Sequence, residues 1–75
     1  MNLLKRGWRK LRANVQPIVS KYVECDRVSL VVSDFSVCVH VWNNKDITDF
    51  IYISRPLEEI TLKMVVKEIH KYFNN

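Results

Sequence analysis

Residues 27–54, RVSLVVSDFSVCVHVWNNKDITDFIYIS, decide the fold, because hydrophobic and polar side chains alternate there with a period of two. The alternation predicts two strands, the first up to about Ser33 and the second from Phe35 to Trp42. The polar cluster 43–46 predicts a turn, and residues 47–54, rich in branched and aromatic side chains, predict a third strand. We therefore expect a β-meander over about residues 27–54.

The first hairpin is expected to turn at Ser33 and Asp34. This register places every apolar residue of the two strands on one face of the sheet. The expected pairs are Val32 with Phe35, Leu30 with Val37, and Val28 with Val39.

An amphipathic helix is predicted before the meander, over about residues 2–23. Its apolar stripe has alternating spacings of four and three and consists of Leu4, Trp8, Leu11, Val15, Ile18 and Tyr22. Pro17 lacks the backbone donor of an inner helical residue, so a kink or a short break is expected there.

A second helix is predicted after the meander, over about residues 61–73, with Thr61 as its N-cap. Its stripe consists of Leu62, Val65, Val66, Ile69, Tyr72 and Phe73. Leu57, Ile60 and Met64 fall out of phase with this stripe, so residues 56–60 are interpreted as a separate turn. The expected fold is α+β in the order α-β-β-β-α, with a three-stranded antiparallel sheet packed with two helices in a single domain, 1–75.

The size and composition of the chain favour a binding protein over an enzyme. With 75 residues, of which 48% are hydrophobic and 27% charged, the chain has the balance of one small folded domain. Such a domain has little room for an internal substrate cavity. A single glycine also excludes glycine-rich phosphate loops, so no cofactor is expected.

Cysteine usage and hydropathy predict a cytoplasmic protein. Cys25 and Cys38 are too few for the disulfide framework of a small secreted domain. Basic residues interrupt the first twelve positions, so neither a signal peptide nor a transmembrane segment is expected.

Positive charge is concentrated before residue 24. Residues 1–23 carry +6 with no acid, whereas the remainder carries −2. This asymmetry suggests a polyanionic partner, either nucleic acid or an anionic lipid surface, although a solvated helix face explains it equally well. The candidate nucleic-acid-binding residues are Lys5, Arg6, Arg9, Lys10 and Arg12 on the first helix and Lys63, Lys67 and Lys71 on the second. If both helices pack on one side of the sheet, these two basic surfaces could join into one.

The sheet face opposite the valines is a second candidate surface. It carries small polar side chains and a group of rings for protein interaction or base stacking, consisting of His40, Trp42 and, depending on the register of the third strand, Phe50 and Tyr52. The competing interpretation places one helix on each face, which would make these residues part of the core.

The sequence gives little support for a metal site or a catalytic site. Cys38 and His40 share a strand face, but a zinc site would need two further ligands. Neighbouring positions on a strand face also point in parallel, which argues against a nucleophile and base pair. No metal site is predicted.

The element order resembles that of double-stranded RNA-binding domains, in topology alone. That family has a Gly-Pro and His loop between its first two strands and a lysine-rich start to its last helix. This chain has the short Ser33 and Asp34 turn and the spaced Lys63, Lys67 and Lys71 instead. We therefore assign it to no family.

The leading functional hypothesis is a small nucleic-acid-binding or nucleoprotein-associated protein that contacts phosphates through its basic N-terminal helix. The alternative is a protein-interaction module, such as a small regulator or inhibitor of a larger protein complex. Attachment to a membrane surface through the first helix is a third option. The thin core also allows a homodimer.

Overall fold

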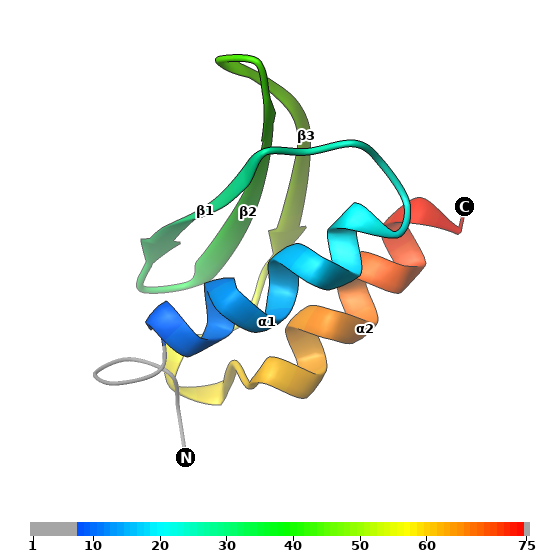
Figure 1. Cartoon of the computed structure of the whole chain (residues 1–75). Helices are drawn as coiled ribbons and strands as arrows, with labels where there is room; N and C mark the ends of the chain where they lie inside the picture. Colours follow the sequence, from blue (N-terminus) through cyan, green and yellow to red (C-terminus); the bar gives the residue numbers. More distant parts are fainter. Residues whose placement is uncertain (1–7, 75) are drawn as a thin grey trace.

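The computed structural model describes residues 8–74 of the chain, with side chains from Arg12 onward. The elements follow in the order α1 (Trp8–Ser20), β1 (Arg27–Ser33), β2 (Ser36–Asn43), β3 (Asp46–Ile53), the single 3-10 turn η1 (Leu57–Glu59) and α2 (Leu62–Phe73). The strands form one antiparallel sheet in the order β1-β2-β3 (Figure 1). The predicted α+β fold is confirmed.

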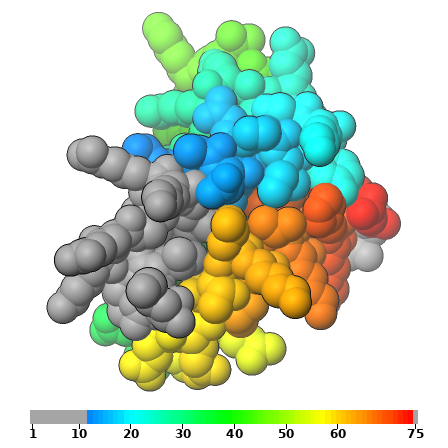
Figure 2. All heavy atoms as spheres, turned by 60° about the horizontal axis from the view of Figure 1, so that its bottom comes forward, coloured from blue at the N-terminus to red at the C-terminus, as the bar shows by residue number. Residues whose placement is uncertain are grey.

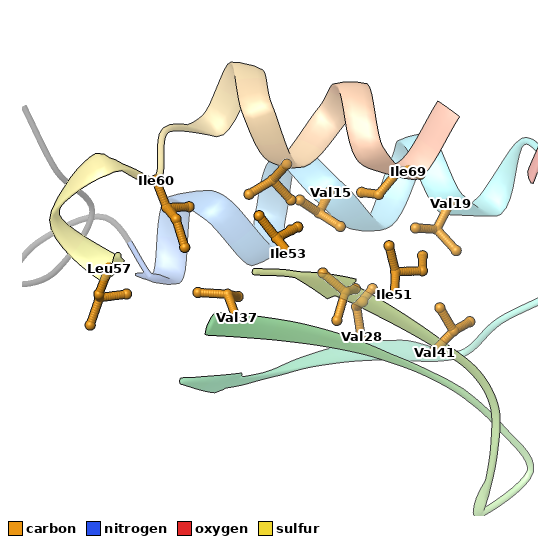
Figure 3. Packing of buried hydrophobic residues seen from close by; sticks show 12 residues of the cluster. Val15, Val19, Val28, Val37, Val41, Ile51, Ile53, Leu57, Ile60 and Ile69 are labelled. Atoms are coloured by element: carbon orange, nitrogen blue, oxygen red, sulfur yellow. The ribbon is translucent and has the colours of Figure 1, made fainter. Parts of the chain in front are cut away.

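Both helices lie on the same side of the sheet, which excludes one helix on each face (Figures 1 and 3). The valine face meets α1 and α2 in a core whose members have at most 9% of their surface exposed. This core consists of Val15, Val19, Val28, Val37, Val39, Val41, Ile51, Ile53, Leu57, Ile60, Val65 and Ile69. The opposite face of the sheet has no layer of described residues over it.

The first hairpin differs from its predicted register. Ser33 pairs with Ser36, and the two-residue turn is Asp34 and Phe35 rather than Ser33 and Asp34. Each β1 residue therefore pairs two positions further along β2 than expected, for example Val28 with Val41. A shift of two preserves which face each side chain occupies. Phe35, expected on the apolar face, lies in the turn and is 74% exposed.

Helix α1 continues across Pro17, so the predicted break is absent. The assigned helix ends at Ser20, and backbone hydrogen bonds from residues 21–23 to Ile18 and Val19 extend the helical turn. The predicted extent to residue 23 is therefore too long by three residues, and residues 2–7 lie outside the described part. Within residues 8–74, neither helix is long and apolar enough to span a membrane.

The segment after β3 behaves as two pieces, as predicted. Residues 57–59 form η1, and α2 begins after Thr61, whose Oγ1 accepts a hydrogen bond from the Met64 backbone N–H at 3.3 Å. Leu57 and Ile60 are out of phase with α2 because they belong to η1 and the residue after it, from which they complete the core.

Helices α1 and α2 also pack against each other, and Figure 2 shows them side by side. The ring of Tyr22, just after α1, stacks on Phe73 with centroids 5.0 Å apart and planes 11° apart. The Tyr22 hydroxyl also shares a hydrogen bond with Nδ1 of His70. These contacts close one end of the helical layer.

Candidate functional site

The uncovered face of the sheet, called the open face below, brings together most of the predicted interaction residues. Cross-strand pairing arranges its side chains in rows that run from β1 through β2 to β3. The three central rows are Arg27, Trp42 and Ile47; Ser29, His40 and Phe50; and Val31, Cys38 and Tyr52. His40, Trp42, Phe50 and Tyr52 therefore lie on adjacent strands of one surface, as predicted.

Trp42 is fixed at one end of the open face by two contacts to β1. Its Nε1–H donates a hydrogen bond to Ser29 Oγ at 2.9 Å. The guanidinium carbon of Arg27 lies 4.0 Å from the centre of the Trp42 ring, which is the geometry of a cation–π contact. Trp42 is half-buried, so its position is set by packing while part of the ring remains available.

His40 and Phe50 form the centre of the open face. Their rings meet edge to face, with centroids 4.9 Å apart and planes at 72°. Phe50 keeps 44% of its surface exposed, far more than its neighbour Ile51, which faces the core at 2%. The side chains of adjacent residues of β3 thus lie on opposite faces of the sheet, as the period of two requires.

Tyr52 and Cys38 form the far row. Tyr52 is 65% exposed, whereas Cys38 is 5% exposed and lies beneath its neighbours. Burial raises the pKa of the Cys38 thiol, and hydrogen bonds to Tyr52 and to the Ile51 backbone only partly oppose this effect. The thiol therefore stays protonated near neutral pH and fills space, which is the ordinary role of a buried cysteine.

The carboxylates of β3 lie off the open face. Asp49 lies opposite the buried Val41, and the register shift between Val41 and Trp42 pairs Asp46 with Asn43 instead of placing it in the rows of the open face. The Asp49 carboxylate accepts hydrogen bonds from Tyr72 and Thr48, each at 3.0 Å. The three central rows consequently carry one cation, Arg27, and no acid.

Further cations lie at both ends of the aromatic row. Lys45 occupies the exposed β2–β3 turn, beyond Trp42. At the other end, Arg55 and Lys67 line one shallow pocket with Tyr52, which Glu68 also borders. Cations therefore lie at both ends of the row of exposed rings, accompanied by the carboxylates of Asp26 and Asp46 at one end and of Glu68 at the other.

The basic residues predicted on the helices are only partly described. Lys5 and Arg6 lie outside the described residues, and Arg9 and Lys10 belong to α1 without described side chains. Arg12 is exposed and borders grooves along β1. Lys63, Lys67 and Lys71 are exposed and lie along α2.

The predicted junction of the two basic surfaces depends mostly on cations whose side chains lie outside the described residues, and Arg12 and Lys67 are described members of the two surfaces. Arg12 shares its grooves with residues of β1, whereas Lys67 borders the end of β3. These strands are the two opposite edges of the sheet. The helices do pack on one side, but these two cations face away from each other.

Sequence reasoning missed two cations that border the open face. Arg27 continues the alternation of Ser29 and Val31 by one more step, so the period-two pattern was sufficient to find it. Arg55 lies after the end of β3, and only the path of the chain toward η1 brings it near Tyr52.

Metal ligands are not gathered anywhere in the described part of the chain. Residues 8–74 contain no group of three or more His, Cys, Asp or Glu side chains that could hold an ion. Cys25 and Cys38 are both free thiols.

Comparison with known proteins identified no relative of this chain. The chain has no match among protein-family models, curated proteins or solved structures.

Proposed function

We propose that this protein binds single-stranded nucleic acid and that the bases stack on the open face. The observation that carries this proposal is the row of partly exposed rings on a sheet face that no described element covers and whose three central rows contain no carboxylate. Unpaired bases stack on aromatic side chains displayed by a sheet, and every base offers a ring face for such contact. Trp42, Phe50 and Tyr52 supply the stacking surface, and His40 supports Phe50 from the side.

Phosphate contacts are assigned to the cations around this row and to α1. Arg27 and Lys45 lie near one end of the row, and Arg55 and Lys67 near the other. The concentration of positive charge in residues 1–23 supports a further contribution from the basic N-terminal helix, of which Arg12 is the described member. Binding should therefore weaken steeply as the salt concentration rises.

In this proposal, the protein acts in the cytoplasm by binding and has no enzymatic activity. Its open face has exposed rings and no acid–base pair, and burial raises the pKa of the one thiol beside His40. These features suit recognition of a ligand more than chemical conversion of one.

Fluorescence anisotropy with labelled oligonucleotides tests the proposal. Single- and double-stranded DNA and RNA of about 15 nucleotides, the upper range of one small binding surface, are compared at low and near-physiological salt. We expect single strands to bind more tightly than duplexes. Replacing Phe50 or Tyr52 by Ala should weaken binding about 5- to 100-fold, because one stacked base contributes about 1 to 3 kcal/mol.

Phe35→Ala is the matched control, since Phe35 is an exposed phenylalanine in the β1–β2 turn. It should bind like the unmodified protein. Equal binding of single strands and duplexes, unaffected by Phe50→Ala but lost in Arg12→Glu, would restrict the interaction to phosphate contacts from the helix. Absence of binding at low salt would overturn the proposal.

A second candidate function uses the same surface. Val31, which is 52% exposed, lies at the β1 end of the row that Cys38 and Tyr52 continue, so the open face also offers apolar side chains to a protein partner. In this case the protein acts as a small regulator or inhibitor of a larger complex. Lack of oligonucleotide binding, together with capture of one defined complex that Tyr52→Ala releases, would favour it.

A further inference from the structure

The two edges of the sheet differ in how well they are protected from pairing with another strand. β3 contains a β-bulge, carries Asp46 and Asp49, and is separated by Ser54 alone from Arg55 and Pro56. Charges, prolines and bulges are the usual devices that prevent edge pairing. The β3 edge therefore has several of them.

The β1 edge has none of these devices over residues 28–33. The sequence VSLVVS contains no charge, no proline and no glycine, and its pairing with β2 shows no register shift. β1 has β2 as its only described strand neighbour, so its outer backbone groups have no strand partner among residues 8–74. Val31 and Val32 are 52% and 39% exposed. An unprotected strand of this kind is a template for another strand.

We propose that β1 pairs with β1 of a second copy of this chain, in antiparallel orientation about a two-fold axis at Val31. The two sheets then form one continuous six-stranded sheet. A two-fold axis perpendicular to the sheet keeps both helical layers on one side and both open faces on the other. It also requires that one residue of β1 lies opposite itself.

The sequence of β1 favours Val31 as that residue. Centring on Val31 pairs Val31 with itself, Ser29 with Ser33, and Leu30 with Val32. Hydroxyl groups then meet hydroxyl groups, and branched side chains meet branched side chains. The neighbouring registers, centred on Leu30 or Val32, place a serine opposite Val31 instead.

Charges at the ends of β1 support the same orientation. Val28 shares a groove with Arg12 and Arg27, and Asp34 follows the other end of the strand. Antiparallel pairing centred on Val31 places Val28 of one copy opposite Asp34 of the second. Each Asp34 carboxylate thus approaches the Arg12 guanidinium of the other copy, at both ends of the interface, while the Arg27 guanidinium stays over the Trp42 ring. This charge complementarity identifies a second copy as the occupant of the edge.

Molar mass in solution tests the pairing, independently of what the open face binds. Light scattering after size exclusion is measured from low micromolar to near-millimolar concentration. We expect a concentration-dependent approach to twice the 8.9 kDa mass of one chain. Val31→Lys places two ammonium groups face to face at the axis, so it should remain a monomer while keeping the circular dichroism of the folded chain.

Tyr52→Lys is the matched control, because Tyr52 lies in the same row as Val31 but on the opposite edge. It should still form the dimer. A monomer at every concentration, or a dimer that Tyr52→Lys abolishes and Val31→Lys does not, would overturn the proposal.

Cysteine cross-linking tests the register. In a Cys25→Ser background, Ser29→Cys and Ser33→Cys variants are mixed and mildly oxidised. A covalent dimer that forms much faster in the mixture than in either variant alone is expected, because Ser29 lies opposite Ser33 of the second copy. Equal rates in the mixture and in the separate variants would contradict pairing centred on Val31.

Discussion

At the scale of single residues, the β2–β3 turn contains the clearest local strain. Asn44 and Lys45 both have positive φ angles, 53° and 74°. Two-residue hairpin turns of this kind favour Asn followed by Gly, because a side chain with a Cβ atom is crowded in the left-handed region. Asn44 fits this preference and Lys45 does not.

We therefore expect Lys45→Gly to raise the free energy of unfolding by about 0.5 to 1 kcal/mol. Urea denaturation followed by circular dichroism measures the change. Lys45→Ala, which removes the charge but keeps the Cβ atom, should show no such gain. Equal stability of the Gly and Ala variants would mean that the backbone at residue 45 is not strained.

Phe35 shows what the pattern of apolar and polar residues could not predict. The alternation of apolar and polar side chains correctly predicted the faces of the residues of β1 and β2, but not the position of Phe35. It could not distinguish registers that differ by two, because such registers share the same faces. The observed turn is supported by the backbone N–H of Leu57, which donates to the Asp34 carbonyl at 3.0 Å. Because Leu57 and Asp34 are far apart in the sequence, no pattern close to the turn could have indicated this contact.

At the scale of elements, α1 accommodates a proline in its interior. Pro17 cannot donate the hydrogen bond that would satisfy the Ala13 carbonyl, yet the helix continues on both sides of it. Both residues are exposed, so water can reach the unpaired carbonyl. Packing of Val15 and Val19 against the sheet compensates for the lost backbone bond.

Pro17→Ala should therefore stabilise the protein by roughly 1 to 3 kcal/mol, since proline is about 3 kcal/mol less favourable than alanine inside a helix. Thermal and chemical denaturation measure the gain. Asn14→Ala, at another exposed position of α1, is the control and should give a clearly smaller gain from helix propensity alone. A less stable Pro17→Ala variant would show that the packing of α1 depends on the proline.

Element types were well predicted because each has its own period and its own end signals. The predicted cap at Thr61 is present, and so is the separate turn before it. The part that Leu57 and Ile60 take in the core was missed, because a 3-10 turn is too short to display a periodic stripe.

At the scale of the whole molecule, the helix arrangement decides whether an aromatic surface is available. The two apolar stripes were compatible with helices on one face or on both faces of the sheet. In the structure, α1 and α2 share the valine face and pack against each other, which leaves the open face uncovered (Figure 3). The sequence predicted which residues form this surface. It did not predict that the surface is exposed, because this depends on the paths of the connections after residues 20 and 53.

The stacking of Tyr22 on Phe73 also has a kinetic consequence. Both hairpins close through two-residue turns, whereas Tyr22 meets His70 across 48 positions of sequence. Because the entropy of closing a loop grows with its length, the hairpins should form before the helix pair. We expect Tyr22→Leu to accelerate unfolding in stopped-flow experiments while leaving the folding rate nearly unchanged. A slower folding rate in this variant would place the helix pair in the transition state, and the last step of folding would then be the completion of the sheet.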